Sequence, residues 1–395
     1  MNDLPKHYKS ADAQVRNMSG IVFEDVEIEP YNGTSFNTTT NRKIQFRLPR
    51  TGILDPQKSY MLADYEIANS GAIYSAMSCF KKMKVWIGNV LAVDEDYFNW
   101  ARHKEYDAYM STDEQNSTSN KATGYGVSSL GASSSATLKL PLTDVKFWKR
   151  GFFSKKLPLY KLNQITIELE IDDDINRFTS GDADTLTINN CELKLHLIDG
   201  PSLRSEYGGE IKGSYLTHEK HFRNLPSSST RINEIIPAHY NEVKFILVEQ
   251  QLNSLVDLGV TASGPAYNFT GNHTLNSANN CEVIIDGEHF PKNPIETDDI
   301  VELEDNLRKC WAPNSTKLGD YVHNYADRTS EANMYIGVPL ASELKSVSGQ
   351  KLSNKSGSIV VKSDCNATAQ TDLNIWVYYN KFYKITADGA FSIVE

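Results

Sequence analysis

Alternation of apolar and polar residues is the feature that most limits how this chain can fold. It runs through two long segments, residues 185–198 (TLTINNCELKLHLI) and 372–385 (DLNIWVYYNKFYKI). A shorter segment of the same kind precedes each of them, at 165–171 (ITIELEI) and 356–363 (SGSIVVKS). Successive side chains of a β-strand point to opposite faces, so these segments predict strands with one buried face. Each half of the chain therefore closes in β-structure.

Two tight hairpins indicate that the halves share one plan. The segments VWIGNVLAV (85–93) and VIIDGEHFP (283–291) each carry a two-residue turn, Gly-Asn and Asp-Gly, and Val283 lies 198 residues after Val85. Both turns suit a hairpin because their residues adopt positive φ at little cost. The same offset places 338–340 (VPL) on 140–142 (LPL), and an offset of 199 places 242–247 (EVKFIL) on 43–48 (KIQFRL) in matching strand phase.

One helical stretch follows each hairpin. In residues 297–311 the apolar positions have helical spacing, acids open the run, bases close it, and Pro313 follows, as the helix dipole favours. In residues 94–110 a comparable stripe contains Tyr97, Trp100, Ala101 and Ala108. Such a stripe predicts core packing rather than a cofactor site.

These patterns predict an all-β chain of two eight-stranded antiparallel jelly-roll sandwiches in tandem, each with a short inserted helix. The expected parts are an N-terminal arm (1–20), a first sandwich (21–200), a linker (201–212) rich in glycine, and a second sandwich (213–395). Two polar segments, 111–135 and 253–280, are expected to be surface loops, because burying them would leave backbone polar groups unpaired.

Composition argues against several classes of function. The 395 residues carry a formal net charge of −10, so specific nucleic-acid binding is not expected. The sequence has no run of about 20 apolar residues and no apolar segment near its start, which predicts a protein made in a cytosol without a secretory signal. The five cysteines form no Cys-x-x-Cys pair and are expected to be buried thiols rather than disulfides or zinc ligands.

The sequence contains no motif whose spacing fits catalysis or metal binding. HEKHF (218–222) spaces its histidines three apart rather than four, and DDD (172–174), which we expect to be a solvated turn, lacks the spacing of an EF-hand loop. Phosphate-binding glycine loops and the nucleophile elbow are missing. We therefore assign no catalytic, cofactor-binding or metal residues and no cofactor, and expect no enzymatic activity.

The order of segments resembles that of double jelly-roll major capsid proteins, the lineage of adenovirus hexon and tailless icosahedral phages, with smaller versions in virophages and Polinton-like elements. The segments are 46–67 (FRLPRTGILDPQKSYMLADYEI), 85–93, 140–171 (LPLTDVKFWKRGFFSKKLPLYKLNQITIELEI) and 283–295 (VIIDGEHFPKNPI). The likeness runs from about Phe23 to the end. Residues 157–171 resemble the strand pair that ends the first barrel in that family.

This resemblance implies a virion protein whose homotrimers form pseudo-hexagonal capsomers. Its implied partners are neighbouring capsomers, penton or minor capsid proteins, and an internal membrane reached by the arm, with 111–135 and 253–280 facing outward. Two alternatives remain. One is a carbohydrate-binding double sandwich, such as a viral spike or lectin, with Trp86, Trp148 and Trp376 as sugar platforms. The other is a double jelly-roll enzyme of the copper monooxygenase or glycoamidase type, although the nine histidines are dispersed.

Overall fold

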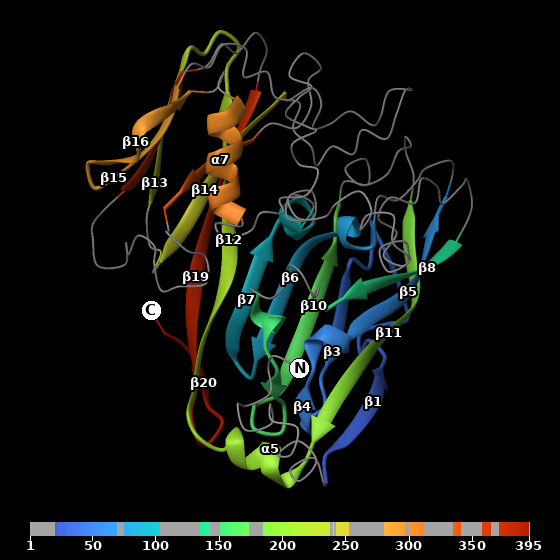
Figure 1. The fold of residues 1–395 in the computed structure, drawn as a ribbon. Helices are drawn as coiled ribbons and strands as arrows, with labels where there is room; N and C mark the ends of the chain where they lie inside the picture. Colours follow the sequence, from blue (N-terminus) through green and yellow to red (C-terminus); the bar gives the residue numbers. More distant parts are fainter. Residues whose placement is uncertain are drawn as a thin grey trace.

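The computed structural model of this chain contains four antiparallel sheets (Figure 1). The structure describes residues 20–68, 75–102, 135–142, 151–173, 185–237, 240, 242–252, 280–296, 300–311, 335–340, 358–364 and 371–394. The predicted arm apart from Gly20, and the polar loops apart from the strand residues Ser135 and Asn280, lie outside these residues.

The first half supplies sheets 1 and 2. Sheet 1 has the order β8-β5-β11-β4-β9, with β1 and β2 also paired to β11, and sheet 2 has the order β3-β10-β6-β7. Their strands are β1 (Val22–Ile28), β2 (Ser35–Asn37), β3 (Lys43–Arg47), β4 (Ile53–Leu54), β5 (Tyr60–Ile67), β6 (Phe80–Ile87), β7 (Val90–Asp96), β8 (Ser135–Pro141), β9 (Leu157–Pro158), β10 (Ile165–Ile171) and β11 (Leu186–Asp199). The short helices η2 (Pro56–Lys58), η3 (Met77–Cys79) and η4 (Phe152–Ser154) lie between them.

The second half supplies sheets 3 and 4. Sheet 3 has the order β12-β19-β14-β17, with β20 also paired to β19, and sheet 4 has the order β13-β18-β15-β16. Their strands are β12 (Ile211–Leu225), β13 (Arg231–Pro237), β14 (Val243–Leu252), β15 (Asn280–Ile285), β16 (Glu288–Glu296), β17 (Tyr335–Pro339), β18 (Ser358–Asp364), β19 (Thr371–Ile385) and β20 (Phe391–Val394). Helix α5 (Pro201–Glu206) precedes β12, and α7 (Ile300–Trp311) lies between β16 and β17.

The two halves have the same topology. The order β3-β10-β6-β7 of sheet 2 corresponds strand for strand to the order β13-β18-β15-β16 of sheet 4. The β2-β11-β5-β8 part of sheet 1 corresponds in the same way to the order β12-β19-β14-β17 of sheet 3. In each half the chain passes between the two sheets of a sandwich in the order that defines a jelly roll. The predicted fold class is confirmed.

Two of the three pairs of segments that the sequence offsets matched are equivalent in the structure. The turns Gly88-Asn89 and Asp286-Gly287 close the equivalent hairpins β6–β7 and β15–β16, and the two proline-containing segments form β8 and β17. The third match is wrong, because KIQFRL forms β3 of sheet 2 whereas EVKFIL forms β14 of sheet 3. The strand equivalent to β14 is β5. The sequence comparison failed because alternation of apolar and polar residues shows which face of a strand is buried, and not which sheet contains the strand.

The prediction for the second half holds within the described residues, but the prediction for the first half began too early, because residues 94–96 are the end of strand β7. The predicted helix of the second half is α7, and Phe98–Arg102 are helical in the first half, beyond which the segment lies outside the described residues. The predicted strand pair at 157–171 is wrong: β9 pairs with β4 in sheet 1, whereas β10 lies in sheet 2 between β3 and β6.

The long strands β12 and β19 join the two halves. They pair over fifteen residues each, and the part of this ribbon next to β20 runs beside β7 of the first half (Figure 1). Helix α5 lies at the end of the molecule where β11 leads into β12 (Figure 1). The two sandwiches therefore share an interface to which both halves contribute side chains.

Candidate functional site

The centre of this interface is a lysine surrounded by aromatic rings. The Nζ atom of Lys220, in β12, lies 4.1 Å from the ring centre of Tyr97 and 4.0 Å from that of Trp100, both in the first half. It lies 5.5 Å from the ring centre of Trp376 in β19. Tyr97 has φ of 55°, a conformation that costs a non-glycine residue energy. A cation attracts aromatic faces most strongly where water is excluded, so this cluster holds the halves together.

Trp376 is the deepest member of the cluster. It is fully buried, its ring centre lies 6.3 Å from that of Tyr97 and 6.5 Å from that of Trp100, and its Nε1 donates a hydrogen bond of 3.0 Å to Glu249 Oε2 in β14. The outer face of sheet 3 is thus covered by the first half. Trp376 is core, which removes it as a sugar platform. Trp86 is half-buried in β6, and Trp148 lies outside the described residues.

A second aromatic group lies closer to α5. The ring of Phe152, in η4, meets those of Tyr215, Tyr383 and Phe391 edge-on, with centres 5.4, 5.9 and 6.2 Å away. The hydroxyl of Tyr215 donates to the backbone oxygen of Ala92 in β7. Burial raises the pKa of Tyr215 well above its ordinary value, so the phenol stays protonated and remains a donor.

Backbone contacts complete the interface at its base. Lys161 Nζ donates to the carbonyl oxygens of Tyr207 (3.0 Å) and Gly208 (3.2 Å), which follow α5. At Gly389, in the β19–β20 turn, an added Cβ would lie 1.9 Å from the backbone oxygen of Lys161. Only glycine allows the two halves to approach so closely.

The equivalent outer face of sheet 1 is polar and exposed. Lys194 Nζ lies 2.6 Å from Glu27 Oε1, and His196 Nδ1 lies 2.6 Å from Asp25 Oδ1. Phe23, which is 52% exposed, stacks on His196 with ring centres 5.8 Å apart. This face has the topological position of the buried face of sheet 3, but nothing in the described chain covers β1.

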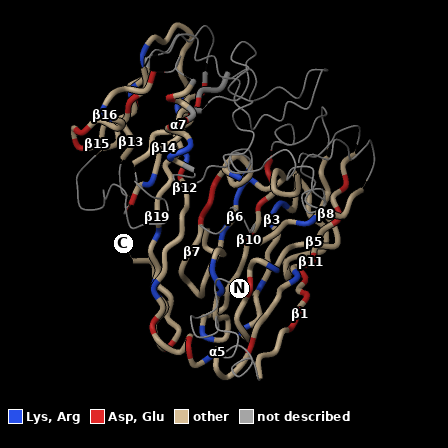
Figure 2. The backbone as a smooth tube through the Cα atoms, in the orientation of Figure 1, with Lys and Arg blue, Asp and Glu red and all other residues tan. Residues whose placement is uncertain are grey.

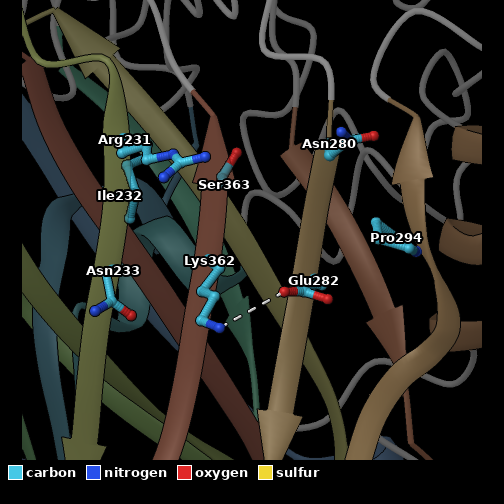
Figure 3. A pocket seen from close by; sticks show the side chains of 8 residues that line it. All are labelled: Arg231, Ile232, Asn233, Asn280, Glu282, Pro294, Lys362 and Ser363. Carbon is cyan, nitrogen blue, oxygen red and sulfur yellow. Dashed lines mark ion pairs between the residues drawn. The ribbon is translucent and has the colours of Figure 1, made fainter.

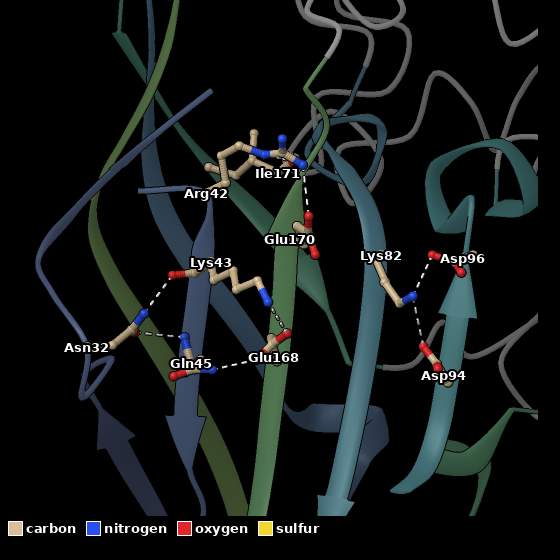
Figure 4. A network of polar contacts seen from close by, with 10 residues as sticks. All are labelled: Asn32, Arg42, Lys43, Gln45, Lys82, Asp94, Asp96, Glu168, Glu170 and Ile171. Carbon is tan, nitrogen blue, oxygen red and sulfur yellow. Dashed lines mark hydrogen bonds and ion pairs between the residues drawn. The ribbon is translucent and has the colours of Figure 1, made fainter. Parts of the chain in front are cut away.

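The outer face of sheet 2 carries charges that neutralise one another (Figure 4). Lys82 Nζ lies 2.8 Å from Asp96 Oδ1 and 3.3 Å from Asp94 Oδ1, and Lys43 Nζ lies 3.3 Å from Glu168 Oε1. Burial alone would lower the pKa of Lys82, but the hydrogen bond to Asp96 and the charges of both aspartates outweigh it and raise the pKa. Cross-strand pairs of opposite charge stabilise a sheet modestly and attract no charged ligand. Figure 2 shows acidic and basic residues interspersed along the strands in the same way.

The outer face of sheet 4 has a groove of about 420 Å³ (Figure 3). Arg231 and Asn233 border it on β13, Lys362 on β18, Asn280 and Glu282 on β15, and Pro294 on β16. The sequence analysis did not predict this groove. Its lining residues are far apart in the chain and come together only when the four strands pair.

The sequence motifs examined for chemistry have structural roles. His218 and His221 lie on strand β12; His218 Nε2 is 3.0 Å from the Asp96 backbone oxygen, and His221 Nε2 is 2.7 Å from the Tyr240 hydroxyl. Asp172 was expected in a solvated turn, but it is fully buried and accepts a hydrogen bond of 2.7 Å from Asn99. At Asp172 that expectation was wrong, because Asn99, in the helical residues after β7, and the backbone of Cys79 bind it in the interior; Asp173 is half exposed, and Asp174 lies outside the described residues.

Four cysteines, Cys79, Cys191, Cys281 and Cys310, are free and buried. Burial raises the pKa of the Cys191 and Cys281 thiols to about 12, so these side chains are inert. Cys365 lies outside the described residues. Among the residues that the structure describes, no group of three or more His, Cys, Asp or Glu side chains could hold a metal ion. No described helix is long and apolar enough to cross a membrane.

Known proteins match this chain in structure and not in sequence. No protein-family model matches it, and no curated protein matches it. The PBCV-1 protein VP54, fitted into a reconstruction of the virophage Sputnik, superposes with a TM-score of 0.62 at 12% identity, over 95% of this chain and 97% of that chain. The Faustovirus major capsid protein gives 0.57 at 9% identity, over 96% and 92%. The mavirus major capsid protein gives 0.53 at 12%, over 95% and 90%. The fold is that of double jelly-roll major capsid proteins.

Proposed function

We propose that this chain is the major capsid protein of a tailless icosahedral DNA virus, a structural component of the virion and not an enzyme. The observation that carries the proposal is the pair of equivalent jelly rolls, matched over about 95% of the chain by structures of the Faustovirus and mavirus major capsid proteins. A shell needs a subunit with repeated, similar contacts, and a duplicated sandwich provides them.

We further propose a homotrimer in which six sandwiches form a pseudo-hexagonal capsomer. Within one chain, β7 and the following helical residues cover the outer face of sheet 3. In topology, β16 and α7 of the second half are equivalent to β7 and the helical residues of the first half. The outer face of sheet 1 is likewise equivalent to the outer face of sheet 3. If β16 and α7 of one copy cover sheet 1 of the next, the arrangement repeats, and three copies close a ring of six sandwiches.

The two kinds of contact differ in chemistry. The intrachain face is aromatic and buried, with Trp376 and Tyr378 at most 1% exposed. The exposed face of sheet 1 carries the Lys194–Glu27 and His196–Asp25 pairs around Phe23. Permanent interfaces resemble a protein core, whereas interfaces between partners that fold separately are more polar. This difference suits a subunit that folds before it assembles.

The remaining assignments belong to the same proposal. Residues 1–20 form the arm, 21–200 and 213–395 the sandwiches, and 201–212 the linker. The arm, with three basic residues, Lys6, Lys9 and Arg16, against Asp3 and Asp12, faces inward toward neighbouring capsomers or an internal membrane. Residues 111–135 and 253–280 face outward, and penton or minor capsid proteins are further partners. Deleting residues 1–20 should leave the trimer intact and impair particle assembly; unchanged assembly would refute the arm's role.

Size-exclusion chromatography with light scattering tests the trimer. We expect a mass of about 133 kDa, three times the 44.3 kDa of the chain, and hexagonal outlines by electron microscopy. A strictly monomeric protein at high concentration would contradict the proposed trimer and favour a lectin or an enzyme. The structure offers no support for the enzyme among its described residues, and burial of Trp376 removes one of the three aromatic platforms on which the lectin alternative depended.

A further inference from the structure

The outer edge of β3, in sheet 2, is closed by residues that precede β2. Tyr31 donates its backbone N–H to the carbonyl oxygen of Gln45 at 3.0 Å. The Asn32 side chain donates from Nδ2 to the carbonyl oxygen of Lys43 at 2.7 Å, and its Oδ1 accepts from the backbone N–H of Gln45 at 3.0 Å (Figure 4). These bonds occupy backbone groups that an edge strand otherwise leaves open to another chain.

The path of the chain explains why only the first half has this cap. Strands β1 and β2 both pair with β11, and residues 29–34 between them leave sheet 1 and reach β3. In the second half the equivalent strand, β12, stays paired with β19 without a break from Ile211 to Leu225. It therefore sends no segment to β13, which is the strand of sheet 4 equivalent to β3.

The outer edge of β13 is open. On one side this strand pairs along its whole length with β18. On its other side, no backbone hydrogen bond reaches it between Ile232 and Pro237 from any residue that the structure describes. Alternate N–H and C=O groups of an antiparallel strand point away from its partner, so β13 offers these groups to a further strand.

The side chains on the two edges differ in the same sense. Arg47 pairs with Thr166 and Ile235 pairs with Val360, at equivalent positions of β10 and β18. The Arg47 guanidinium lies 4.1 Å from the ring centre of Tyr31, whereas Ile235 is an apolar side chain that is 61% exposed. A charge on an edge strand hinders pairing with another chain, and an exposed apolar residue favours it.

We propose that the open edge of β13 pairs antiparallel with β13 of a second copy, which belongs to a neighbouring capsomer. In the proposed trimer β16 faces the next copy, and β13 lies at the opposite side of sheet 4, so its edge is on the outer rim of the capsomer. A strand that pairs with its own copy forms a two-fold contact, which needs no second kind of surface. The choice of this partner rests on the proposed capsomer, whereas the open edge itself does not.

The residues of β13 favour one register of this pairing. When the two-fold axis passes Ile235, the two isoleucines lie opposite each other and Asn233 lies opposite Pro237. An axis at Glu234 would instead place two carboxylates opposite each other, which destabilises a strand pair. The overlap of residues 233–237 is far too short to bury the roughly 1,200 Å² of a stable complex. The contact is therefore weak between free capsomers and gains strength from its repetition in a shell.

Disulfide trapping of the full-length chain tests the contact. Oxidised with copper phenanthroline at high protein concentration, Ile235→Cys should form a dimer through the introduced cysteine, detected on a non-reducing gel and located by mass spectrometry. Opposed residues of an antiparallel pair have Cβ atoms about 4.5–5.5 Å apart, close to the spacing in a disulfide. Arg47→Cys, at the equivalent position of the capped edge, is the matched control, and the wild-type chain gives the background from the native cysteines. We expect Ile235→Cys to cross-link at least about tenfold faster than Arg47→Cys, because paired strands hold the two cysteines at a high effective concentration.

Equal rates for the two cysteine variants would overturn the proposal, whatever the oligomeric state. As a second variant, Ile235→Arg copies the first half and should weaken the association between trimers at least about tenfold by light scattering, with the trimer and the urea unfolding midpoint unchanged. Association that survives Ile235→Arg, or loss of the trimer itself, would place Ile235 outside this contact and overturn the proposal. Selective cross-linking of Ile235→Cys in a chain that proves monomeric would support the edge contact while the proposed capsomer fails.

Discussion

Lys220 of the second jelly roll lies over Trp100 of the first, with 4.0 Å between the Nζ atom and the ring centre. The two residues are 120 positions apart in the chain, and each belongs to a different sandwich. Together with the contacts of Phe152, Tyr215 and Lys161, this contact holds the two sandwiches in one relative placement. In the proposed capsomer this placement sets the angle between adjacent corners of the hexagon.

Replacing Lys220 by alanine should weaken the interface between the halves. Partly buried cation–aromatic contacts contribute up to about 2 kcal/mol, so we expect the free energy of unfolding to fall by about 1–2 kcal/mol, measured by urea denaturation. Lys212→Ala is the control, because the Lys212 side chain is 75% exposed on the same strand. Equal stability of the two variants would show that the aromatic cluster does not depend on the charge.

Alanine at Gly389 should cost more than alanine at Gly287. Both glycines occupy turns with positive φ, +89° and +85°, but an added Cβ at Gly287 meets nothing within 4 Å whereas at Gly389 it would overlap the Lys161 backbone oxygen. Backbone strain alone predicts about 1 kcal/mol for Gly287→Ala, and overlap adds about 1–3 kcal/mol at Gly389. Similar unfolding midpoints for the two variants would mean that the β19–β20 turn moves away freely.

The salt-bridged Asp173 should stabilise the fold in a pH-dependent way. Burial alone would raise the pKa of this carboxyl, but the hydrogen bond from Lys81, a hydrogen bond shared with Asp172 and the charge of Lys81 hold it well below 3.8. A carboxyl with a lowered pKa contributes stability above its ordinary pKa and loses it as the pH falls through the folded value. Asp173→Asn should therefore lower stability at pH 7 by less than about 1 kcal/mol, since the side chain is half exposed.

Below pH 4 the deficit of Asp173→Asn should shrink steadily. Unfolding by urea at pH 7, 5 and 3 measures it, with Glu288→Gln at the exposed start of β16 as the control for loss of one carboxylate. A deficit that stays constant down to pH 3 would show that the asparagine acts through packing rather than charge.

Aspartate at Phe23 should disrupt the proposed trimer and spare the monomer. Phe23 is 52% exposed on β1, so its replacement removes few contacts within the chain, but it lies on the face that another copy would cover. We expect the dissociation constant measured by light scattering to rise at least about tenfold, as for an apolar residue at the centre of an interface. Ile235→Asp, on the outer face of sheet 4 and 61% exposed, is the matched control; equal effects would place the interface elsewhere.

Local patterns in the sequence predicted the elements with good accuracy. Asp286-Gly287 and Gly88-Asn89 form tight turns in which Asp286, Gly287 and Gly88 have positive φ, and the residue types at the turn are enough to predict this. The long alternating segments became β11 and β19, since burial of one face needs no knowledge of the partner strand. The spacing of Leu303, Leu307 and Cys310 placed α7 for the same reason, and all three are buried.

The partners of these elements followed from the tertiary structure alone. Two alternating segments, 43–48 and 242–247, looked equivalent but lie in different kinds of sheet, because strand pairing depends on residues far away in the chain. The sequence allowed Trp376 to be either an exposed sugar platform or a core residue. It is a core residue because Tyr97 and Trp100 of the other half pack against it. The groove beside Glu282 likewise required β13, β18, β15 and β16 to lie together. Sequence by itself determined what each segment becomes, since that depends on near neighbours; the tertiary structure decided which surfaces are covered, since covering a face requires contacts between distant parts of the chain.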